Sequence, residues 1–282
     1  FGTGALLRGF VDAFLDAANR QGRFGGRVVV VGSTGSGRDR AFAEQDGLYT
    51  LVTRGIAEGA PVEERRIVAS VSRALSAVDE WDAVLAVARS PELEVIFSNT
   101  TEIGIALDEG DAPDLAPPRS FPGKLAVVLH ERARHFAFAP SKAPVVVPCE
   151  LIEGNGARLR AIVLALAERW RFEPGFARWV EQHLRVVDTL VDRIVPGAPS
   201  ADDAAALASS LGYRDALLTA CEPYRLFAIE GDDALRARLP WAAADSGIVV
   251  TPDVRPFRER KVRMLNGTHT IAVPLALLAG CE

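Results

Sequence analysis

The chain has 282 residues with a net charge of −5 at neutral pH, and 49% of its residues are hydrophobic. That length suffices for two domains or one large α/β domain, and the acidic balance without a local run of Lys and Arg argues against a nucleic-acid surface. No apolar run reaches the roughly 18–20 residues of a membrane span, and the three cysteines form no CxxC pair, so we expect a protein of the reducing cytoplasm with neither disulfides nor a metal site.

The amino-terminal segment has the pattern of a dinucleotide-binding βαβ unit. Gly2-Thr3-Gly4 opens a helix whose apolar residues recur at helical spacing, and the β-branched run 27–32 predicts a buried parallel strand. The backbone N–H groups of Gly2 and Gly4 would approach a pyrophosphate at the start of the helix; a plain tight turn is the alternative. Because the chain begins at Phe1 without a methionine, we expect the first strand of the unit to lie outside it.

The end of this strand bears on the choice of cofactor. The strand runs into Gly32 and Ser33, so the carboxylate that commonly binds the adenosine ribose is not at its usual place. Arg38 and Arg40 would suit a 2′-phosphate, whereas solvated loop charges are the commoner reading. The residues alone therefore leave NAD and NADP open.

The middle of the chain alternates between the two kinds of element. We expect strands at 48–53, 66–70, 94–97 and 143–148, and helices at 71–86, 123–136, 157–170 and 174–183. Asn99 and Thr100 follow one of these strands and Glu150 follows another. Since open α/β sheets bind ligands at the carboxyl ends of their strands, these residues are predicted to contact a ligand, with helix capping as the alternative.

The sequence pattern changes near residue 197 from alternating strands and helices to mostly helices, and we place a domain boundary there. Residues 1–196 are predicted to form a Rossmann-type dinucleotide-binding domain, and residues 197–282 an incomplete, mostly helical substrate domain. A helix is expected at 201–210 and a strand at 247–251. The last residues follow an apolar run with no helix cap, so the predicted fold is an α/β protein truncated at both ends.

The helix that opens after Pro256 carries the strongest candidate for chemistry. At about 100° per residue, Lys261, His269 and Asn266 project at roughly 0°, 80° and 140°, so all three can face one cleft. An amine, an imidazole and an amide around one point suit a carbonyl/alcohol redox site, in which the lysine moves the proton and the other two hold the oxygen. A solvated basic helix with a capped end is the alternative.

These segments together resemble the polyol-specific long-chain dehydrogenase family, the mannitol dehydrogenase group. Its motif Lys-x4-Asn-x2-His is matched at Lys261, Asn266 and His269. The remaining segments that carry the likeness are Phe1-Gly2-Thr3-Gly4 with Arg8, 98–102, 148–152 with Asn155-Gly156, 191–195, Glu222-Pro223 and 229–231. Within the family, the likeness is greatest to the branch that reduces the ketone of tagaturonate to altronate.

The resemblance implies the functional residues as well as the fold. It implies metal-independent, NAD-linked reduction of an open-chain sugar or sugar acid in a cleft between the two domains, with Lys261 as acid and base. It assigns cofactor contacts to Gly2, Gly4, Arg8, Ser33, Asn99 and Thr100, and substrate contacts to Glu150, Asn155, Asp192 and Arg193. Mannitol dehydrogenases carry an asparagine where this chain has Leu151, so half of the amide pair that polarises the carbonyl is either absent or supplied by Asn155. This difference favours the sugar-acid branch.

Three other readings remain from the sequence. The same fold would serve a fructuronate reductase or a mannitol 2-dehydrogenase. A non-catalytic NAD-binding module is the rival from a different class, and a helical interaction protein rests only on the apolar run near the carboxyl end. The partners expected are a small sugar acid and the cofactor, without nucleic acid or membrane, and the oligomeric state is open.

Overall fold

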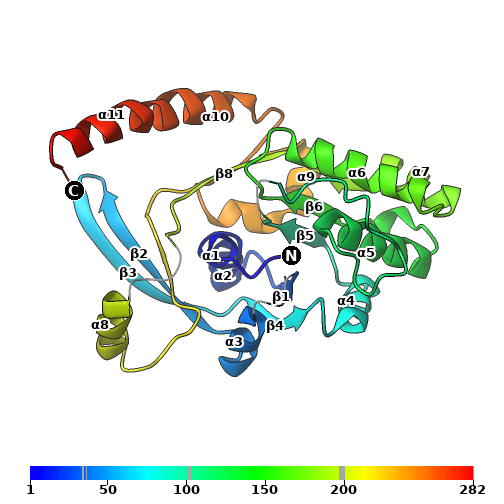
Figure 1. Ribbon diagram of the computed structural model, residues 1–282, viewed down its shortest axis with the longest axis horizontal. Helices are drawn as coiled ribbons and strands as arrows, with labels where there is room; N and C mark the ends of the chain where they lie inside the picture. Colours follow the sequence, from blue (N-terminus) through cyan, green and yellow to red (C-terminus); the bar gives the residue numbers. More distant parts are fainter. Residues whose placement is uncertain (34, 36, 101–102, 197–200, 282) are drawn as a thin grey trace.

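The computed structural model describes residues 1–33, 35, 37–100, 103–196 and 201–281. Its strands are β1 (Val28–Gly32), β2 (Tyr49–Ala57), β3 (Ala60–Val68), β4 (Val71–Ser76), β5 (Val95–Ser98), β6 (Val145–Pro148), β7 (Arg185–Val186), β8 (Thr189–Asp192), β9 (Thr219–Cys221), β10 (Leu226–Glu230) and β11 (Ile248–Thr251). Its longer helices are α1 (Ala5–Gly9), α2 (Val11–Arg20), α3 (Arg38–Glu44), α4 (Trp81–Ala88), α5 (Phe121–His135), α6 (Asn155–Arg169), α7 (Pro174–Gln182), α8 (Ala201–Leu211), α9 (Asp233–Arg238), α10 (Arg255–Arg260) and α11 (Gly267–Leu278). Figure 1 shows how they are arranged.

The centre of the molecule is a parallel sheet interrupted at its middle. β1 pairs with β4, and β5, β6 and β7 form a second parallel set. The first residues of the chain join the two sets, since Gly2 N donates to Val31 O at 2.9 Å and Asn99 N donates to Phe1 O at 3.1 Å. Phe1 and Gly2 therefore lie between β1 and β5, where a doubly wound sheet has its central strand. The predicted Rossmann-type α/β fold is confirmed.

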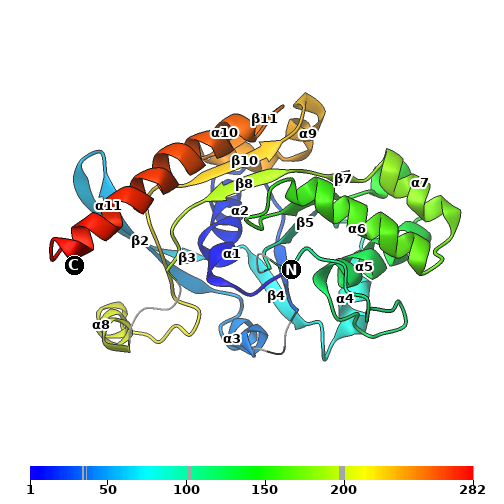
Figure 2. The same ribbon diagram turned by 45° about the horizontal axis from the view of Figure 1, so that its top comes forward.

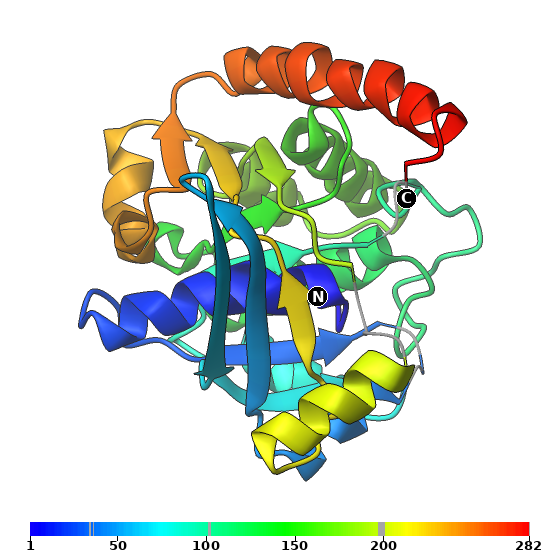
Figure 3. The same cartoon turned by 90° about the vertical axis from the view of Figure 1, so that its left-hand side faces the viewer.

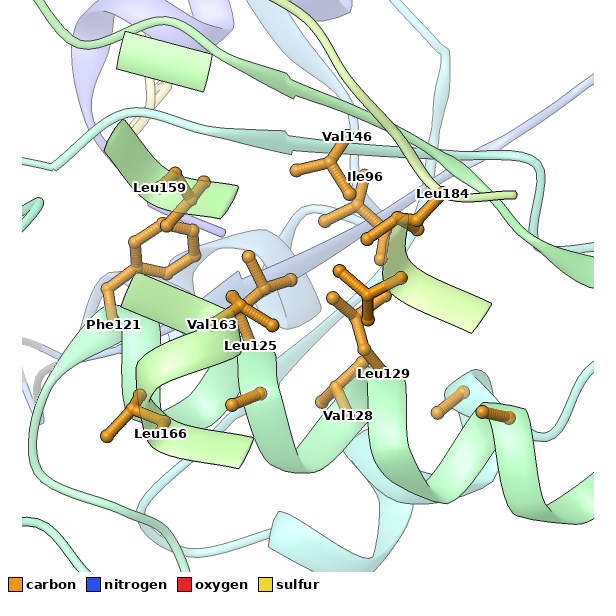
Figure 4. Close-up of a cluster of buried hydrophobic side chains, with 14 of the residues drawn as sticks. Ile96, Phe121, Leu125, Val128, Leu129, Val146, Leu159, Val163, Leu166 and Leu184 are labelled. Atoms are coloured by element: carbon orange, nitrogen blue, oxygen red, sulfur yellow. The ribbon is translucent and has the colours of Figure 1, made fainter. Parts of the chain in front are cut away.

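Helices cover both faces of this sheet, as parallel strands require. The side chain of Val146 in β6 packs with α5 and α6 on one face, whereas Val145 and Val147 face α1, α2 and β10 on the other. This alternation follows from the two-residue period of a strand. Figure 4 shows the first of these cores, in which Leu125 and Leu129 of α5 meet Val163 of α6 beneath Ile96 and Val146.

A long hairpin and a mixed sheet complete the fold. β2 and β3 pair antiparallel from Tyr49 and Val68 to the turn at Ala57 and Ala60, and β9 adds to β2 in parallel (Figure 3). β10 lies between β8, antiparallel to it, and β11, parallel to it. Strands from beyond residue 201 thus pair with strands from before residue 193.

Two predictions about these elements need correction. The expected helix at 71–86 is strand β4 followed by helix α4, because Val71–Ser76 pairs with β1 instead of continuing into the helix. The region from 201 to 281 contains the strand expected at 247–251, which is β11, but also β9 and β10, which were not expected, so it is less helical than predicted. The predicted boundary adjoins residues 197–200, which lie outside the described residues, and it stays a prediction.

The chain ends in one long helical rod that runs along the body and extends past it (Figure 2). α10 continues through a π-helical turn, η3 (Lys261–Asn266), into α11. None of the side chains described for η3 and α11 is buried, and apolar residues such as Ile271 and Leu275 are exposed. Within the described ranges, none of the helices combines the length and apolarity needed to span a bilayer.

Candidate active site

The glycine turn lies against the carboxyl ends of β1 and β5. Gly2 has a φ of +125°, and a Cβ there would lie 3.0 Å from both Asn99 O and Leu7 Cδ1, so only glycine fits. Gly4 precedes α1, and a Cβ on it would meet nothing within 4 Å. Close packing thus requires Gly2, whereas Gly4 leaves open space in front of the backbone. This is the arrangement in which a diphosphate can approach main-chain N–H groups.

Arg8 lies behind this turn instead of facing a ligand. Its side chain is buried, with Nη1 donating to Thr3 O at 2.6 Å and Nε to Thr219 Oγ1 at 2.8 Å. Burial lowers the pKa of the guanidinium, and the neighbouring Tyr49 and Asp12 oppose that shift. Arg8 Nε and Nη1 thus hold the glycine turn to β9, and the cofactor contact of Arg8 stays a prediction.

Ser33 occupies the end of β1 on the same side as the turn. Its Oγ atom is buried and has no hydrogen-bond partner in the part of the chain that the structure describes. A Cβ on the preceding residue, Gly32, would lie 3.5 Å from Thr3 Cγ2 and 3.8 Å from Asp39 Cβ. A buried polar atom without a partner is uncommon, so this position fits a ligand hydroxyl. The open space at Gly4 and the unpartnered Ser33 Oγ together fit a dinucleotide.

Glu150 connects the ends of β5 and β6. Its carboxylate is 2% exposed and accepts from Ser98 Oγ at 3.1 Å and from Thr100 N and Oγ1, each at 3.0 Å. Asn99 Nδ2 donates to Cys149 O at 2.9 Å across the same junction. Both Glu150 oxygens are thus occupied from within the chain. The residue orders the loop after β5, where Asn99 and Thr100 were predicted to meet the cofactor.

Asn155 is fully buried at the start of α6, and its amide group is fully engaged. The two N–H donors of Nδ2 are shared among Pro148 O, Glu150 O and Thr189 Oγ1, which lie at 3.1, 3.0 and 2.9 Å. Oδ1 accepts from Gly156 N at 2.8 Å and Thr189 N at 2.9 Å. Both ends of the amide have partners within the chain, and the substrate contact of Asn155 stays a prediction. Asn155 ties β6, α6 and β8 to one another.

Lys261 is the one predicted catalytic side chain that turns toward the body of the protein. Its Nζ donates to Val191 O at 2.9 Å and lies 3.0 Å from Asp192 Oδ1, at the end of β8. The side chains of Lys261 and Asp192 are 14% and 12% exposed. The other carboxylate oxygen, Asp192 Oδ2, is buried and has no hydrogen-bond partner among the described residues.

Arg193, next to Asp192, is directed to the other side of the strand. It donates from Nη1 to Gly9 O at 2.6 Å and from Nε to Glu222 O at 2.9 Å. Burial lowers the pKa of this guanidinium as well. Arg193 thus fixes the end of β8 to the first helix of the chain, and its substrate contact stays a prediction.

Asn266 and His269 do not meet Lys261 as the helical projection predicted. Both are exposed, and His269 Nδ1 lies 2.7 Å from Leu265 O of its own helix. The reason is partly geometric: the projection assumed α-helical spacing, whereas residues 261–266 form a π-helical turn that changes the phase. The predicted convergence of the three side chains is corrected on this point.

Two neighbours of Lys261 were missed by the sequence reading. Arg258, three residues earlier on the same helix, forms a 3.1 Å ion pair with Glu153 in the loop that follows β6. Burial raises the pKa of Tyr224, with smaller contributions from the negative charges of Asp192 and Glu222. The spacing of Arg258 from Lys261 was the available sign, since residues three apart share a helix face.

No group of three His, Cys, Asp or Glu side chains within the described ranges is arranged to bind a metal ion. Cys149 is buried, and burial followed by the nearby Glu150 raises the pKa of its thiol well above the ordinary value. A thiol held in its neutral form is a poor nucleophile. Cys149 is therefore a poor candidate for covalent catalysis.

Comparison with known proteins identifies the family. The model of the mannitol dehydrogenase Rossmann domain matches residues 1–243. Altronate oxidoreductase of Bacillus subtilis (strain 168) is 43% identical over 282 residues, and that of Klebsiella pneumoniae (strain 342) is 43% identical over 283 residues. Each match covers 100% of this chain but 58% of the relative, so the chain spans little more than half the length of these curated relatives.

Solved structures agree with the family match. Pseudomonas fluorescens mannitol 2-dehydrogenase, in a ternary complex with NAD and D-mannitol, superposes with a TM-score of 0.79 at 27% identity, covering 99% of this chain and 57% of that one. A substrate-free D-sorbitol dehydrogenase gives a TM-score of 0.76 at 25% identity, covering 95% of this chain and 56% of that one. The chain therefore belongs to the mannitol dehydrogenase family, and most of its length is the Rossmann domain of that family.

Proposed function

We propose that this chain is the larger part of an NAD-dependent oxidoreductase that reversibly reduces the ketone of tagaturonate to altronate. The observation that carries the proposal is the Lys261 amine, which is held at the end of β8 by Val191 O and Asp192. The altronate oxidoreductases at 43% identity favour a sugar acid as the substrate. The chain spans 58% of their length, so the activity is proposed for the full-length protein.

The cofactor would bind along the edge formed by the glycine turn and the ends of β1 and β5. Gly2 and Gly4 would admit the diphosphate, Ser33 Oγ would meet a ribose hydroxyl, and Asn99 and Thr100 would lie beside the nicotinamide ribose. When bound, NAD supplies or accepts the hydride at the carbonyl carbon. The residues of this chain have to bind it, orient it and move one proton.

Lys261 would move that proton. In ketone reduction its ammonium group would donate a proton to the carbonyl oxygen as negative charge develops there, and the neutral amine would recover a proton from solvent. In the reverse direction the neutral amine would take the proton from the alcohol. An amine in this role needs no metal, and the proposal uses none.

Asn266 and His269 would hold the reacting oxygen, as the family motif implies. Both side chains are exposed in this structure. The role therefore requires the helix to rotate about its axis beyond Lys261, or a substrate that extends over the helix to both side chains. The π-helical turn from Lys261 to Asn266 is where such a change in phase is easiest, because π turns are irregular and recur at functional sites. Asp192 would contact the substrate through Oδ2, the oxygen that Lys261 leaves unpartnered.

The substrate site would also depend on Glu150, Asn155 and Arg193. Their hydrogen bonds within the chain would hold the backbone around the substrate in place. We further propose a cytoplasmic enzyme whose ligands are NAD and a sugar acid, without nucleic-acid or membrane partners. Fructuronate reduction and mannitol 2-dehydrogenation are the alternatives with the same site, and an NAD-binding module without turnover is the non-enzymatic one.

The test is NADH oxidation by the full-length protein with tagaturonate, fructuronate and fructose as separate substrates. The proposal predicts the largest kcat/KM for tagaturonate. Preference for fructuronate or fructose would move the assignment to the corresponding alternative. Tight NADH binding by fluorescence, with no turnover of any of the three, would support the non-catalytic module instead.

A further inference from the structure

The ion pair between Lys261 and Asp192 differs from most charge pairs on the surface of this protein. Both side chains are largely covered, at 14% and 12% exposure, whereas the Arg54–Glu63 pair on the hairpin is 60% and 38% exposed. Exposed ion pairs contribute little, because solvent competes for both groups and the long side chains must be ordered. A covered pair with a short contact holds its lysine in one place more effectively.

The contacts also limit where the lysine protons point. An ammonium group has three N–H donors. One is directed to Val191 O at 2.9 Å and a second to Asp192 Oδ1 at 3.0 Å. One N–H therefore remains for a substrate oxygen, and its direction is fixed by the other two.

The acceptors are themselves held rigidly. β8 pairs with β10 so that Asp192 lies opposite Leu226 and Val191 opposite Phe227. At one end of β8, Thr189 N donates to Asn155 Oδ1 at 2.9 Å; beyond the other end, Arg193 Nη1 donates to Gly9 O at 2.6 Å. The position of the Lys261 amine is thus set by its two acceptors at the end of β8.

We propose that Asp192 is a positioning residue for Lys261, fixing the amine so that its third N–H faces the reacting oxygen. The inference rests on the proposed function, because it concerns the direction of the proton that Lys261 transfers. It goes beyond a substrate contact of Asp192, since it concerns the contact between Asp192 Oδ1 and Lys261 Nζ. A misplacement of about 1 Å at a proton donor can reduce the rate of a reaction by about 100-fold.

The test compares two variants of the full-length protein. In Asp192→Ala the acceptor of Lys261 is lost, and kcat is expected to fall about 100-fold, whereas the loss of Oδ2 is expected to raise KM for the sugar acid by a smaller factor. In Asp192→Asn the side-chain oxygen can still accept from Lys261, so kcat is expected to recover to within about tenfold of the wild-type value. Glu259→Gln is the matched control, because Glu259 is an exposed acid on the same helix that pairs with Arg263, and this variant is expected to keep the wild-type kcat.

A second measurement needs no turnover. The rate at which an acylating reagent modifies Lys261, followed by mass spectrometry of the peptide, is expected to rise severalfold in Asp192→Ala and to stay near the wild-type rate in Glu259→Gln. Melting temperatures of all variants identify any that fails to fold, and Asp192→Asn, which keeps the shape of the side chain, then carries the test.

The outcomes separate the inference from the proposed function. A wild-type kcat in Asp192→Ala, or a loss confined to KM, would overturn the positioning role and leave Asp192 as a substrate contact. Equal losses in Asp192→Asn and Asp192→Ala would overturn it too, because placement by a hydrogen bond would not explain them. If Lys261→Ala itself turned over tagaturonate normally, the proposed function would fail, whatever Asp192 does.

Discussion

Replacing Asn155 by alanine tests whether this residue holds the fold together or contacts the substrate. The change removes an amide that donates to Pro148 O, Glu150 O and Thr189 Oγ1 and accepts from Gly156 N and Thr189 N. The side chain is fully buried, so water cannot readily replace these five bonds. Three elements, β6, α6 and β8, lose their common connection.

The size of the effect follows from the groups left behind. A buried polar group without a partner costs about 1–3 kcal/mol. Some of the five groups keep other partners; Pro148 O, for example, still accepts from Thr189 Oγ1 at 2.5 Å. We therefore expect Asn155→Ala to lower the free energy of unfolding by about 4 kcal/mol, near the upper end for single substitutions.

The assay is urea unfolding followed by tryptophan fluorescence, with Asn266→Ala as the control. Asn266 is exposed, so its variant is expected to change the unfolding free energy by less than about 0.5 kcal/mol. A loss below about 1 kcal/mol in Asn155→Ala would refute the structural role. If KM for the sugar acid then rose sharply, Asn155 would be the substrate contact that the sequence predicted.

Three further predictions concern other parts of the chain. Gly2→Ala is expected to weaken NADH binding at least about tenfold, measured by fluorescence titration, because the new Cβ would lie 3.0 Å from Asn99 O at a φ of +125°; unchanged binding would separate the glycine turn from the cofactor. Arg132→Met is expected to lower the free energy of unfolding in urea by about 3 kcal/mol, because its buried guanidinium donates to four carbonyl oxygens. These belong to Ala88, Ser90, Leu93 and Lys142. The control Arg134→Met loses an exposed ion pair and should lower the free energy of unfolding by less than about 1 kcal/mol. Burial raises the pKa of Asp12 from 3.8 to about 7, with Arg8 opposing the shift, so the folded state binds the proton more tightly than the unfolded state. The free energy of unfolding should therefore fall by up to roughly 4 kcal/mol as pH rises from about 4 to about 7. Asp12→Asn should remove this pH dependence in unfolding experiments at about pH 5 and about pH 8. An equal pH dependence in both proteins would contradict the raised pKa of Asp12.

The parallel strands were predictable because they are buried on both faces. Val28–Gly32, Val95–Ser98 and Val145–Pro148 are short apolar runs bounded by polar or turn residues, and all three are strands. Strand β4 was not recognised, since Val71–Ser76 runs into a segment with helical character after only a short break. The pairing with β1 that makes it a strand is a tertiary contact, which local pattern does not contain.

The site was predictable as a set of residues but not as a geometry. Polar side chains typical of ligand contacts were recognised at Arg8, Asn155 and Arg193. The sequence does not reveal that their donors bond to acceptors within the chain, such as Thr219 Oγ1, which is 211 residues away from Arg8. The angular argument for Lys261, Asn266 and His269 assumed a regular helix, and the π-helical turn between them changes the projection. Lys261 turns toward the body because Val191 O and Asp192 supply partners there, and its catalytic role stays a prediction.

The central claim is that the Lys261 amine moves the proton in ketone reduction, and chemical rescue tests it most directly. In the full-length protein, Lys261→Ala should lower kcat for tagaturonate by about 100- to 10,000-fold while NADH still binds, since general acid–base catalysis is worth that much. Adding ethylamine should restore part of the lost rate in proportion to its concentration. A Lys261→Ala protein that turns over tagaturonate at the wild-type rate would contradict the claim.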